Sequence, residues 1–324
     1  MVPRIPVANL SLNMLLRRQS FMLREKTLYK TRAGNLMLRT LLADKSGTIA
    51  GVLFDVQQAV ADKLEVGSGV EVSGQIGEFR NQLQVNMDSI VPTKLVDLSE
   101  FLPTAQRPRD EMLAELDALL ADIRNPHLAH LLSQLLDNPE LRAQFISAPA
   151  SKFNHHACVG GLLEHTLSVA RIVLAACGLY PNVDQDLALC GALLHDIGKV
   201  RAYDPLTFGF TDEGALWSHL YIGASMVEQA IAACPGFPAE LRLRVVHAIL
   251  SHHGKYENGS PVIPMTVEAI ILHYADNLDG DARGAVDHLE REDPNEGPFT
   301  ERSMMHDTKL YRGERGWTED SAES

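Results

Sequence analysis

The stretch of residues 191–199 constrains the fold more than any other part of the sequence. It is a run of small and apolar residues, typical of a buried helix, that ends abruptly in His195 and Asp196, with Gly198 and Lys199 soon after. Burying an imidazole beside a carboxylate is costly unless both groups are compensated. A divalent cation compensates both, because neutral imidazole and ionised carboxylate are metal ligands. The alternative is an ordinary helix end, with Gly198 as the C-cap and the polar residues in water.

Length and composition limit the classes of protein to which this chain can belong. The chain of 324 residues is long enough for two domains, and its 45% hydrophobic and 22% charged content is ordinary for a soluble globular protein. No stretch approaches the about 18 uninterrupted apolar residues of a membrane span, and the first residues lack the apolar segment of a secretory signal. The four cysteines lie in apolar contexts without close pairs, so we expect free thiols. These features predict a cytoplasmic protein with no membrane partner.

The net charge of −13 is unevenly distributed along the chain. Residues 1–95 carry 12 Lys or Arg against 8 Asp or Glu, residues 96–286 carry 12 against 23, and residues 287–324 carry 5 against 11. A basic N-terminal segment followed by acidic residues 96–324 predicts that any polyanion is held by the N-terminal segment. Bound cations would explain the excess of carboxylates in residues 96–286. The alternative is that these carboxylates only interact with solvent.

Residues 1–96 have the pattern of a small β-domain. Short apolar or alternating stretches are separated by turn signals, and a short helical segment at residues 56–64 stands between the third and the fourth stretch. Five strands with a small helix in that position is the order of an OB-fold barrel. The expected strands are residues 21–29, 36–43, 48–54, 70–76 and 82–87.

Several details of this domain resemble nucleic-acid-binding OB-folds. They are the hairpin at residues 44–49, Phe54 and Asp55 after the third strand, and the glycine-rich start of the fourth strand at residues 67–74. Such barrels hold a single strand by stacking bases on aromatic rings and by contacting phosphates with Arg and Lys. The alternative for each phenylalanine is a place in the barrel core. The candidate nucleic-acid contacts are Arg39, Phe54, Phe79 and Arg80.

Residues 97–150 form the expected connector between the barrel and the rest of the chain. A proline-containing linker at residues 103–108 precedes three expected helices at residues 109–124, 128–136 and 139–145. We expect these helices to serve packing and assign no chemistry to them.

Residues 151–290 contain five expected helices that each carry a histidine or an aspartate in an apolar setting. A single inward histidine is more often a hydrogen-bonded core residue than a ligand, but five placements of costly groups favour a metal site over coincidence. A hairpin-like segment at residues 200–214 precedes the third helix. The helices are residues 162–177 with His165, 186–195 with His195 and Asp196 at its end, 216–233 with His219, 245–253 with His252 and His253, and 269–279 with Asp276.

The order His, His-Asp, His, His-His-Gly, Asp resembles the HD-domain superfamily of metal-dependent phosphohydrolases. The resemblance implies a first metal ion, and in members with two metals a second ion with Asp196 as the bridge. His253 adjoins His252 and could substitute for it. The implied ligands are His165, His195, Asp196 and Asp276 for the first ion, and Asp196, His219 and His252 for the second.

Residues 159–166, 250–254 and 260–261, with the tail at residues 298–302 and 310–311, resemble one branch more closely. This is the YhaM-type family, in which an OB-fold precedes an HD domain and which acts as a 3′-to-5′ exoribonuclease. The resemblance spans nearly the whole chain, and the OB-then-HD order is more specific than either domain alone. It implies a multidomain fold, an N-terminal all-β OB-fold barrel followed by an all-α HD domain, that acts on single-stranded RNA or DNA.

Two cations about 3.5–4 Å apart can activate a water and neutralise charge on both sides of a phosphodiester displacement. Asp196 is therefore the central catalytic candidate. Lys199 is expected to contact the scissile phosphate, and the alternative is a solvated lysine that suits a helix C-terminus. His156 and Lys255 are further candidates for phosphate contacts. Histidine and aspartate ligands favour manganese, with iron, magnesium or cobalt as alternatives.

The resulting hypothesis is an exonuclease that threads a single RNA strand from the barrel into the HD cavity and releases mononucleotides. Two alternatives stay open: an HD phosphohydrolase of free or cyclic nucleotides, and a non-catalytic nucleic-acid-binding regulator. We also expect a homo-oligomer. Residues 291–324 form an acidic tail whose far end is expected to be disordered.

Overall fold

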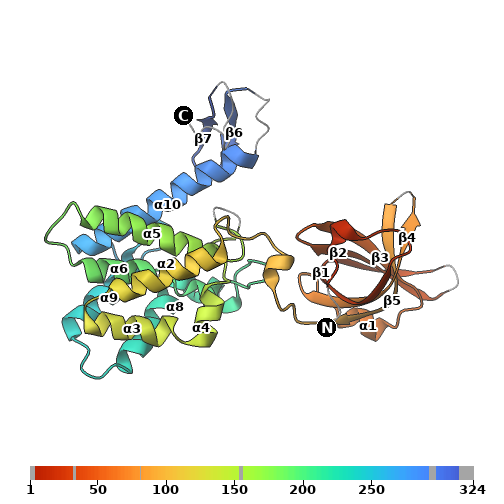
Figure 1. The fold of residues 1–324 in the computed structure, drawn as a ribbon, viewed down its shortest axis with the longest axis horizontal. Coiled ribbons are helices and arrows are strands. Elements are labelled where there is room, and N and C mark those ends of the chain that lie inside the picture. The colour runs from red at the N-terminus through yellow and green to blue at the C-terminus, as the bar shows by residue number, and fades with distance from the viewer. Residues whose placement is uncertain (1–3, 32–33, 81, 153–155, 292–296, 314–324) are drawn as a thin grey trace. The chain divides into compact units, whose positions relative to one another are not determined.

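The computed structural model describes residues 4–31, 34–80, 82–152, 156–291 and 297–313. The chain forms two compact units, Met1–Thr104 and Ala105–Ser324. The first is a β-barrel and the second is helical, which confirms the fold class expected from the sequence (Figure 1). Within the described ranges, none of the helices combines the length and apolar content that crossing a bilayer requires.

The barrel unit is a closed barrel with the strand order β1-β2-β3-β5-β4. All neighbouring strands are antiparallel except β3 and β5, which pair in parallel. The short helix α1 (Gln58–Asp62) stands between the third and fourth strands, as predicted. The strands are β1 (Leu15–Lys30), β2 (Leu36–Asp44), β3 (Gly47–Leu53), β4 (Gly69–Phe79) and β5 (Gln82–Pro92).

The barrel closes because β1 is long and changes register along its length. Its first part pairs with β4 and its second part with β2, with register shifts between Leu16 and Gln19 and between Leu23 and Glu25. β4 shifts register against β5 at Gly74, where a Cβ atom would overlap the carbonyl oxygen of Asn86. Apolar residues that alternate with exposed ones along the strands fill the interior. They include Phe21, Leu38, Leu42, Val70, Val72, Ile76 and Val85.

Residues 97–104, which the sequence analysis placed in the connector, belong to the barrel unit. A 3-10 helix (Leu98–Glu100) presents the carbonyl of Glu100 to the backbone N–H of Lys45 at 3.0 Å. Phe101 is buried beneath the guanidinium of Arg4, which lies 4.4 Å from the ring centroid. Both contacts join residues 98–101 to distant parts of the barrel unit, so the local periodicity of residues 97–104 does not reveal them.

The helical unit contains nine α-helices and one 3-10 helix (Tyr256–Asn258) among its described residues, followed by a two-stranded hairpin. The helices that carry candidate ligands are α5 (Gly161–Cys177), α6 (Gln185–Leu194), α8 (Asp212–Ala232), α9 (Ala239–Ser251) and α10 (Val267–Arg291). The others are α2 (Arg109–Asp122), α3 (Pro126–Leu136), α4 (Pro139–Phe145) and α7 (Lys199–Ala202), and the hairpin strands are β6 (Phe299–Ser303) and β7 (Thr308–Tyr311).

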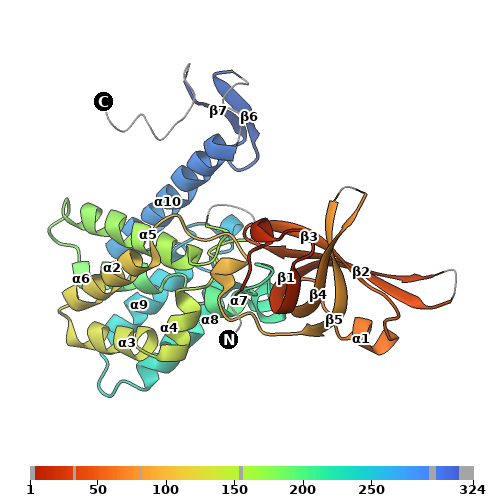
Figure 2. The ribbon, with the colours of Figure 1, turned by 45° about the vertical axis from the view of Figure 1, so that its right-hand side comes forward.

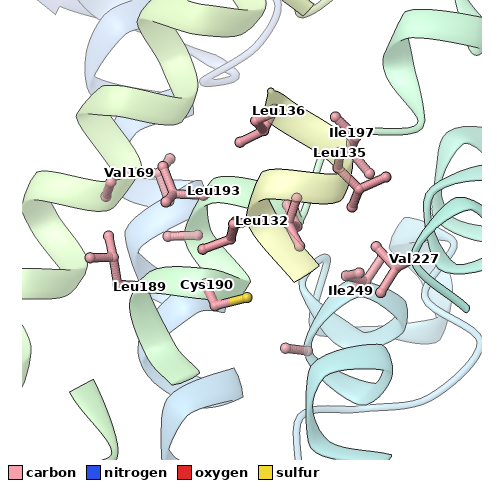
Figure 3. Close-up of a cluster of buried hydrophobic side chains, with 14 of the residues drawn as sticks. Leu132, Leu135, Leu136, Val169, Leu189, Cys190, Leu193, Ile197, Val227 and Ile249 are labelled. Atoms are coloured by element: carbon pink, nitrogen blue, oxygen red, sulfur yellow. The ribbon is translucent and has the colours of Figure 1, made fainter. Parts of the chain in front are cut away.

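The predicted connector helices share one hydrophobic core with the ligand-bearing helices. Figure 3 shows Leu132 and Leu136 of α3 in the same cluster as Val169 of α5, Leu193 of α6 and Ile249 of α9. The four cysteines are free. The connector helices are therefore part of the scaffold on which the candidate ligands stand.

Three parts of the helical unit differ from the sequence prediction. α10 continues to Arg291 through Gly280, because Gly280 is buried and tertiary packing outweighs the roughly 1 kcal/mol by which glycine disfavours a helix. Residues 200–214 contain a short helix and a single bridge between Tyr203 and Phe210 in place of a hairpin. The acidic tail contains the β6–β7 hairpin at the far end of α10 (Figures 1 and 2), while residues 314–324 lie outside the described residues.

Candidate metal centre

Five helices of the helical unit bring imidazoles and carboxylates to one buried place. The side chains of His165, His195, Asp196 and His252 expose at most 2% of their surface. The contributors are His165 from α5, His195 and Asp196 at the end of α6, His219 from α8, His252 at the end of α9 and Asp276 from α10.

Asp196 stands between two pairs of imidazoles. Its Oδ2 atom lies 3.4 Å from Nε2 of His165 and 3.3 Å from Nε2 of His195. Its Oδ1 atom lies 3.4 Å from Nε2 of His219 and 3.6 Å from Nε2 of His252. One carboxylate therefore faces two separate pairs of nitrogen donors, which is the arrangement of a bridging ligand.

Asp276 completes the group on the Oδ2 side of Asp196. Its Oδ1 atom lies 3.1 Å from Nε2 of His165 and 3.8 Å from Nε2 of His195, and these two nitrogens are 3.2 Å apart. Donor atoms that share an ion at about 2.0–2.2 Å lie about 3.0–3.4 Å apart in adjacent positions. The distances therefore fit one ion held by these three residues and Asp196.

The orientation of three rings is set by hydrogen bonds on the side away from the centre. Nδ1 of His195 donates to the carbonyl of Ala192 at 2.7 Å, and Nδ1 of His252 donates to the carbonyl of Ile249 at 2.8 Å. Nδ1 of His165 lies 2.6 Å from Oδ2 of Asp279. Because these oxygens accept, the proton of each neutral ring sits on Nδ1 and the lone pair of Nε2 points into the centre.

Several polar atoms in the centre have no hydrogen-bond partner among the described residues. They are Nε2 of His219, Nε2 of His252 and Oδ1 of Asp196, and all three are buried. A buried polar atom without a partner costs about 1–3 kcal/mol, so three of them together need an explanation. A cation between them satisfies all three, so the residues present fit a bound divalent metal.

The charges of the centre also favour a cation. Burial alone would raise the pKa of Asp196, but Lys199 and the neighbouring histidines hold that pKa well below its ordinary range. Burial opposes a charge on His165, yet the adjacent carboxylates raise its pKa well above the ordinary value, so a metal ion would displace the proton of Nε2 when it binds. Burial lowers the pKa of His219 well below its usual range, which keeps this ring in the neutral form that a ligand requires.

Two unusual backbone positions allow α8 and the end of α6 to approach each other. A Cβ atom at Gly198 would overlap the carbonyl oxygen of His219, so only glycine permits this approach. Ser218 interrupts α8 with φ 63° and ψ 148°, a conformation that residues other than glycine rarely adopt. The interruption starts a second helical segment at His219, whose Nε2 atom faces Asp196.

The two remaining candidates beside the centre are Lys199 and His253. The ammonium of Lys199 lies 2.6 Å from Oδ2 of Asp196. His253 is grouped with His219 and His252, and its Nδ1 atom is hydrogen-bonded to the carbonyl of Asn258 at 2.9 Å. Burial lowers the pKa of His253 to about 4. Between the two adjacent histidines, His252 is the one whose Nε2 faces Asp196.

The two expected phosphate contacts outside the centre lie elsewhere. Lys255 is exposed, and its ammonium lies 3.4 Å from a carboxylate oxygen of Glu257. His156 is buried, with Nδ1 3.1 Å from Glu164 and Nε2 3.2 Å from Asp279. The expectation for His156 is therefore corrected, because its ring is buried and both ring nitrogens face carboxylates of the same domain.

Sequence reasoning missed Asp279 and Glu164. Asp279 lies one turn after Asp276 on α10, so both acids project from the same side of the helix. Glu164 directly precedes His165 and is itself buried. A second acid at the i+3 position of an apolar helix was the available signal for Asp279, whereas the role of Glu164 depends on His156, which lies on a separate segment.

The candidate nucleic-acid contacts of the barrel are at its surface. Phe54 is 60% exposed and Phe79 is 50% exposed, so neither belongs to the barrel core. Arg39 is exposed on β2. The guanidinium of Arg80 lies 5.3 Å from the centroid of the Phe79 ring.

Comparison with known protein families defines the class of each unit. Residues 22–93 match the model of the OB-fold nucleic acid binding domain, and residues 162–281 match the HD domain. The barrel is thus an OB-fold of the nucleic-acid-binding kind, and the five helices with the candidate ligands belong to an HD domain.

Several relatives match this chain over nearly its whole length. The 3′-5′ exoribonuclease YhaM of Bacillus subtilis is 34% identical over 282 residues, which is 86% of this chain and 88% of the relative. The YhaM of Bacillus velezensis is 34% identical over 90% of this chain and 93% of its own, and that of Bacillus licheniformis is 35% identical over 86% and 88%. This chain belongs to the YhaM 3′-5′ exoribonuclease family.

Proposed function

We propose that this protein is a metal-dependent 3′-to-5′ exoribonuclease that hydrolyses single-stranded RNA in the HD domain while the OB-fold holds the strand. The observation that carries the proposal is the Asp196 carboxylate between two pairs of buried imidazole nitrogens. Membership of the YhaM family supports the reaction and its direction. The OB-fold supports a single-stranded nucleic acid as substrate, and DNA is a second candidate strand.

The donor atoms divide into two sets that share Asp196. When bound, two such ions activate a water and neutralise charge on both sides of the phosphodiester. Manganese suits this mixture of imidazole and carboxylate better than magnesium, which prefers oxygen ligands. One set is His165, His195, Asp276 and Oδ2 of Asp196, and the other is His219, His252 and Oδ1 of Asp196.

The side from which the substrate approaches follows from exposure. The side chains of Asp276, Lys199 and His219 are 17%, 13% and 11% exposed, whereas His165, His195 and His252 are almost completely buried. The scissile phosphate therefore reaches the centre between α7, α8 and α10. From its place beside Asp196, the Lys199 ammonium can turn to a phosphate oxygen and neutralise its charge.

The barrel supplies binding without sequence preference. Exposed Phe54 and Phe79 offer ring faces for stacking, and Arg39 and Arg80 offer positive charge for phosphates. Base stacking tolerates every base, so these contacts suit an enzyme that moves along a strand. Cytoplasmic location and assembly into a homo-oligomer remain predictions, and light scattering of the purified protein checks the assembly.

The test is a degradation assay with purified protein, manganese and a single-stranded RNA labelled at its 5′ end. Stepwise shortening from the 3′ end with release of mononucleotides is expected, and blocking the 3′ hydroxyl should slow it. An Asp196→Ala variant serves as the control, because that residue contributes to both sets of donors. No shortening by the wild type, or equal shortening by the variant, would contradict the proposed function.

A further inference from the structure

A chain of hydrogen bonds leads from His165 away from the metal centre. We propose that Asp279, His156 and Glu164 are positioning residues that hold His165 in the orientation of a ligand. This inference rests on the metal-dependent function proposed above. None of the three residues is assigned a place among the donors of the two ions.

Asp279 makes the direct contact. Its Oδ2 atom lies 2.6 Å from Nδ1 of His165, the ring nitrogen on the side away from Asp196. A carboxylate in this position keeps the proton on Nδ1, fixes the plane of the ring and raises the basicity of Nε2. The other two buried rings, His195 and His252, receive this support from backbone carbonyls, so His165 is the one that depends on a side chain.

His156 holds Asp279 in turn. Its Nε2 atom lies 3.2 Å from the same Oδ2 atom of Asp279, and its Nδ1 atom lies 3.1 Å from Oε2 of Glu164. The ring is buried, and the residue has a φ of 56°, which is uncommon for a residue other than glycine. A Cβ atom at Gly161 would overlap the carbonyl oxygen of His156, so the first residue of α5 must be glycine for His156 to lie here.

Glu164 ends the hydrogen-bonded series at a backbone group. Its Oε1 atom accepts a hydrogen bond from the N–H of Arg107 at 3.0 Å. Its Oε2 atom contacts His156, so both carboxylate oxygens of Glu164 are held. The complete series runs from Arg107 through Glu164, His156 and Asp279 to His165.

The segment 105–107 is hydrogen-bonded to the residues just before α5, to α5 itself and to α10, which together carry this series. The N–H of Ala105 donates to the carbonyl of Val159 at 2.9 Å, close to the start of α5. The side chain of Gln106 accepts from Arg283 at 2.8 Å, one turn beyond Asp279 on α10. The N–H of Arg107 donates to Glu164 on α5, so the three residues of this segment hold the parts of the chain that carry the series together.

A third metal ion is the competing explanation, because His156, His165 and Asp279 could together hold one. It would require His165 to bind two ions through its two ring nitrogens. It would also displace the proton that Nδ1 shares with Asp279 at 2.6 Å. The geometry therefore favours a hydrogen-bonded series over another ion.

The experiment measures manganese binding to the full-length protein after metal removal, by the paramagnetic resonance signal of free Mn²⁺. Asp279→Ala should weaken the affinity of one ion by about 10- to 100-fold. Asp279→Asn keeps an acceptor for Nδ1 and should lose less than tenfold. Asp281→Ala, an exposed acid two positions further along the same helix, should bind as the wild type does.

Kinetics separate positioning from a general loss of structure. Excess manganese should restore the kcat of Asp279→Ala on RNA, while the KM for RNA stays unchanged throughout. His156→Gln should weaken manganese binding by a smaller factor, and it keeps the test open if Asp279→Ala does not fold. In the double variant the losses should be smaller than the product of the single losses, because the two residues act in series.

Wild-type affinity in Asp279→Ala, or multiplicative losses in the double variant, would overturn the proposed positioning role. A third bound manganese that disappears in His156→Gln would favour the competing ion. A wild-type protein that binds no manganese would contradict the metal site itself, so the two proposals fail by different results.

Discussion

The two units of this protein carry their candidate functional residues in opposite ways. In the HD domain, imidazoles and carboxylates from five helices converge in the interior, and three of their polar atoms have no hydrogen-bond partner among the described residues. In the OB-fold, the candidate contacts are exposed residues on the surface of a barrel whose core is apolar. Burying a polar group without a partner costs free energy, so such a group indicates a compensating interaction. An exposed aromatic ring or arginine costs little free energy and indicates no particular function.

The physical argument for function is therefore stronger in the HD domain than in the barrel. The HD site rests on a physical argument, because a bound cation would satisfy the buried polar atoms that have no hydrogen-bond partner among the described residues. The barrel contacts are defined by chemical suitability alone, so they depend on experiment. Variants in each unit therefore test whether the two kinds of candidate residue contribute as expected.

The largest effect should come from Asp196→Asn. This change keeps the volume but removes the charge that both sets of donors share, so kcat on single-stranded RNA should fall by roughly 10³-fold or more, several kcal/mol of transition-state stabilisation. Initial rates with saturating manganese measure it. Asp117→Asn, an acid exposed on α2, is the control. A loss of less than tenfold would remove Asp196 from the centre of the mechanism.

Removal of residues 1–104 should separate polymer binding from chemistry. Degradation of a long RNA at low concentration should fall by roughly 10²-fold, because two or three stacked bases are lost at about 1–3 kcal/mol each. Hydrolysis of bis(p-nitrophenyl) phosphate should not change. Circular dichroism checks that the helical unit stays folded. An unchanged rate on RNA would favour the phosphohydrolase of free or cyclic nucleotides.

A smaller effect should follow from Phe54→Ala. Loss of one stacking face should raise the KM for RNA by roughly tenfold, since one stacked base contributes about 1–3 kcal/mol, while kcat stays constant. Steady-state kinetics on a single-stranded oligonucleotide measure both quantities. Val91→Ala, an exposed apolar residue on β5, is the matched control. Equal KM values for Phe54→Ala and the wild type would exclude Phe54 from the binding surface.

Chelation should destabilise one unit and leave the other unchanged. At a metal concentration 100-fold above Kd, binding contributes about 2.7 kcal/mol to the free energy of unfolding. Its removal should lower the Tm of the helical unit by roughly 5–10 °C. Calorimetry with and without a chelator should show no shift in the transition of the barrel. A shift of both transitions, or of neither, would contradict a metal site confined to the HD domain.

The smallest effect should come from Ser218→Gly. The backbone of Ser218, with φ 63° and ψ 148°, lies in a region that glycine adopts readily and that costs other residues about 1–3 kcal/mol. The greater flexibility of glycine in the unfolded chain opposes this gain by about 0.5–1 kcal/mol. The free energy of unfolding should therefore rise by about 1 kcal/mol, as measured by urea denaturation.

Ser225→Gly, at a regular position of the same helix, is the control and should lower the free energy of unfolding. If both variants destabilise the protein equally, the interruption at Ser218 stores no strain.

The sequence pattern predicted the order of the domains, the five strands of the barrel and the five helices that carry the candidate donors. Each of these follows from a local pattern: alternation in the strands, and a histidine or aspartate in an otherwise apolar helix. Phe54 and Phe79 were open between core and surface, because alternation shows which faces a strand has but not which side chain leaves the barrel.

The residues that support the candidate ligands from behind, and the boundaries of the domains, became visible only in the folded structure. His156 was expected at the phosphate, and its burial between Glu164 and Asp279 depends on residues up to 123 positions apart in the chain. The continuation of α10 through Gly280 and the membership of α3 in the main core depend on packing in the same way. A local sequence pattern indicates the free energy of placing one residue in one helix or strand. Hydrogen bonds between distant segments form only when the fold brings their partners together.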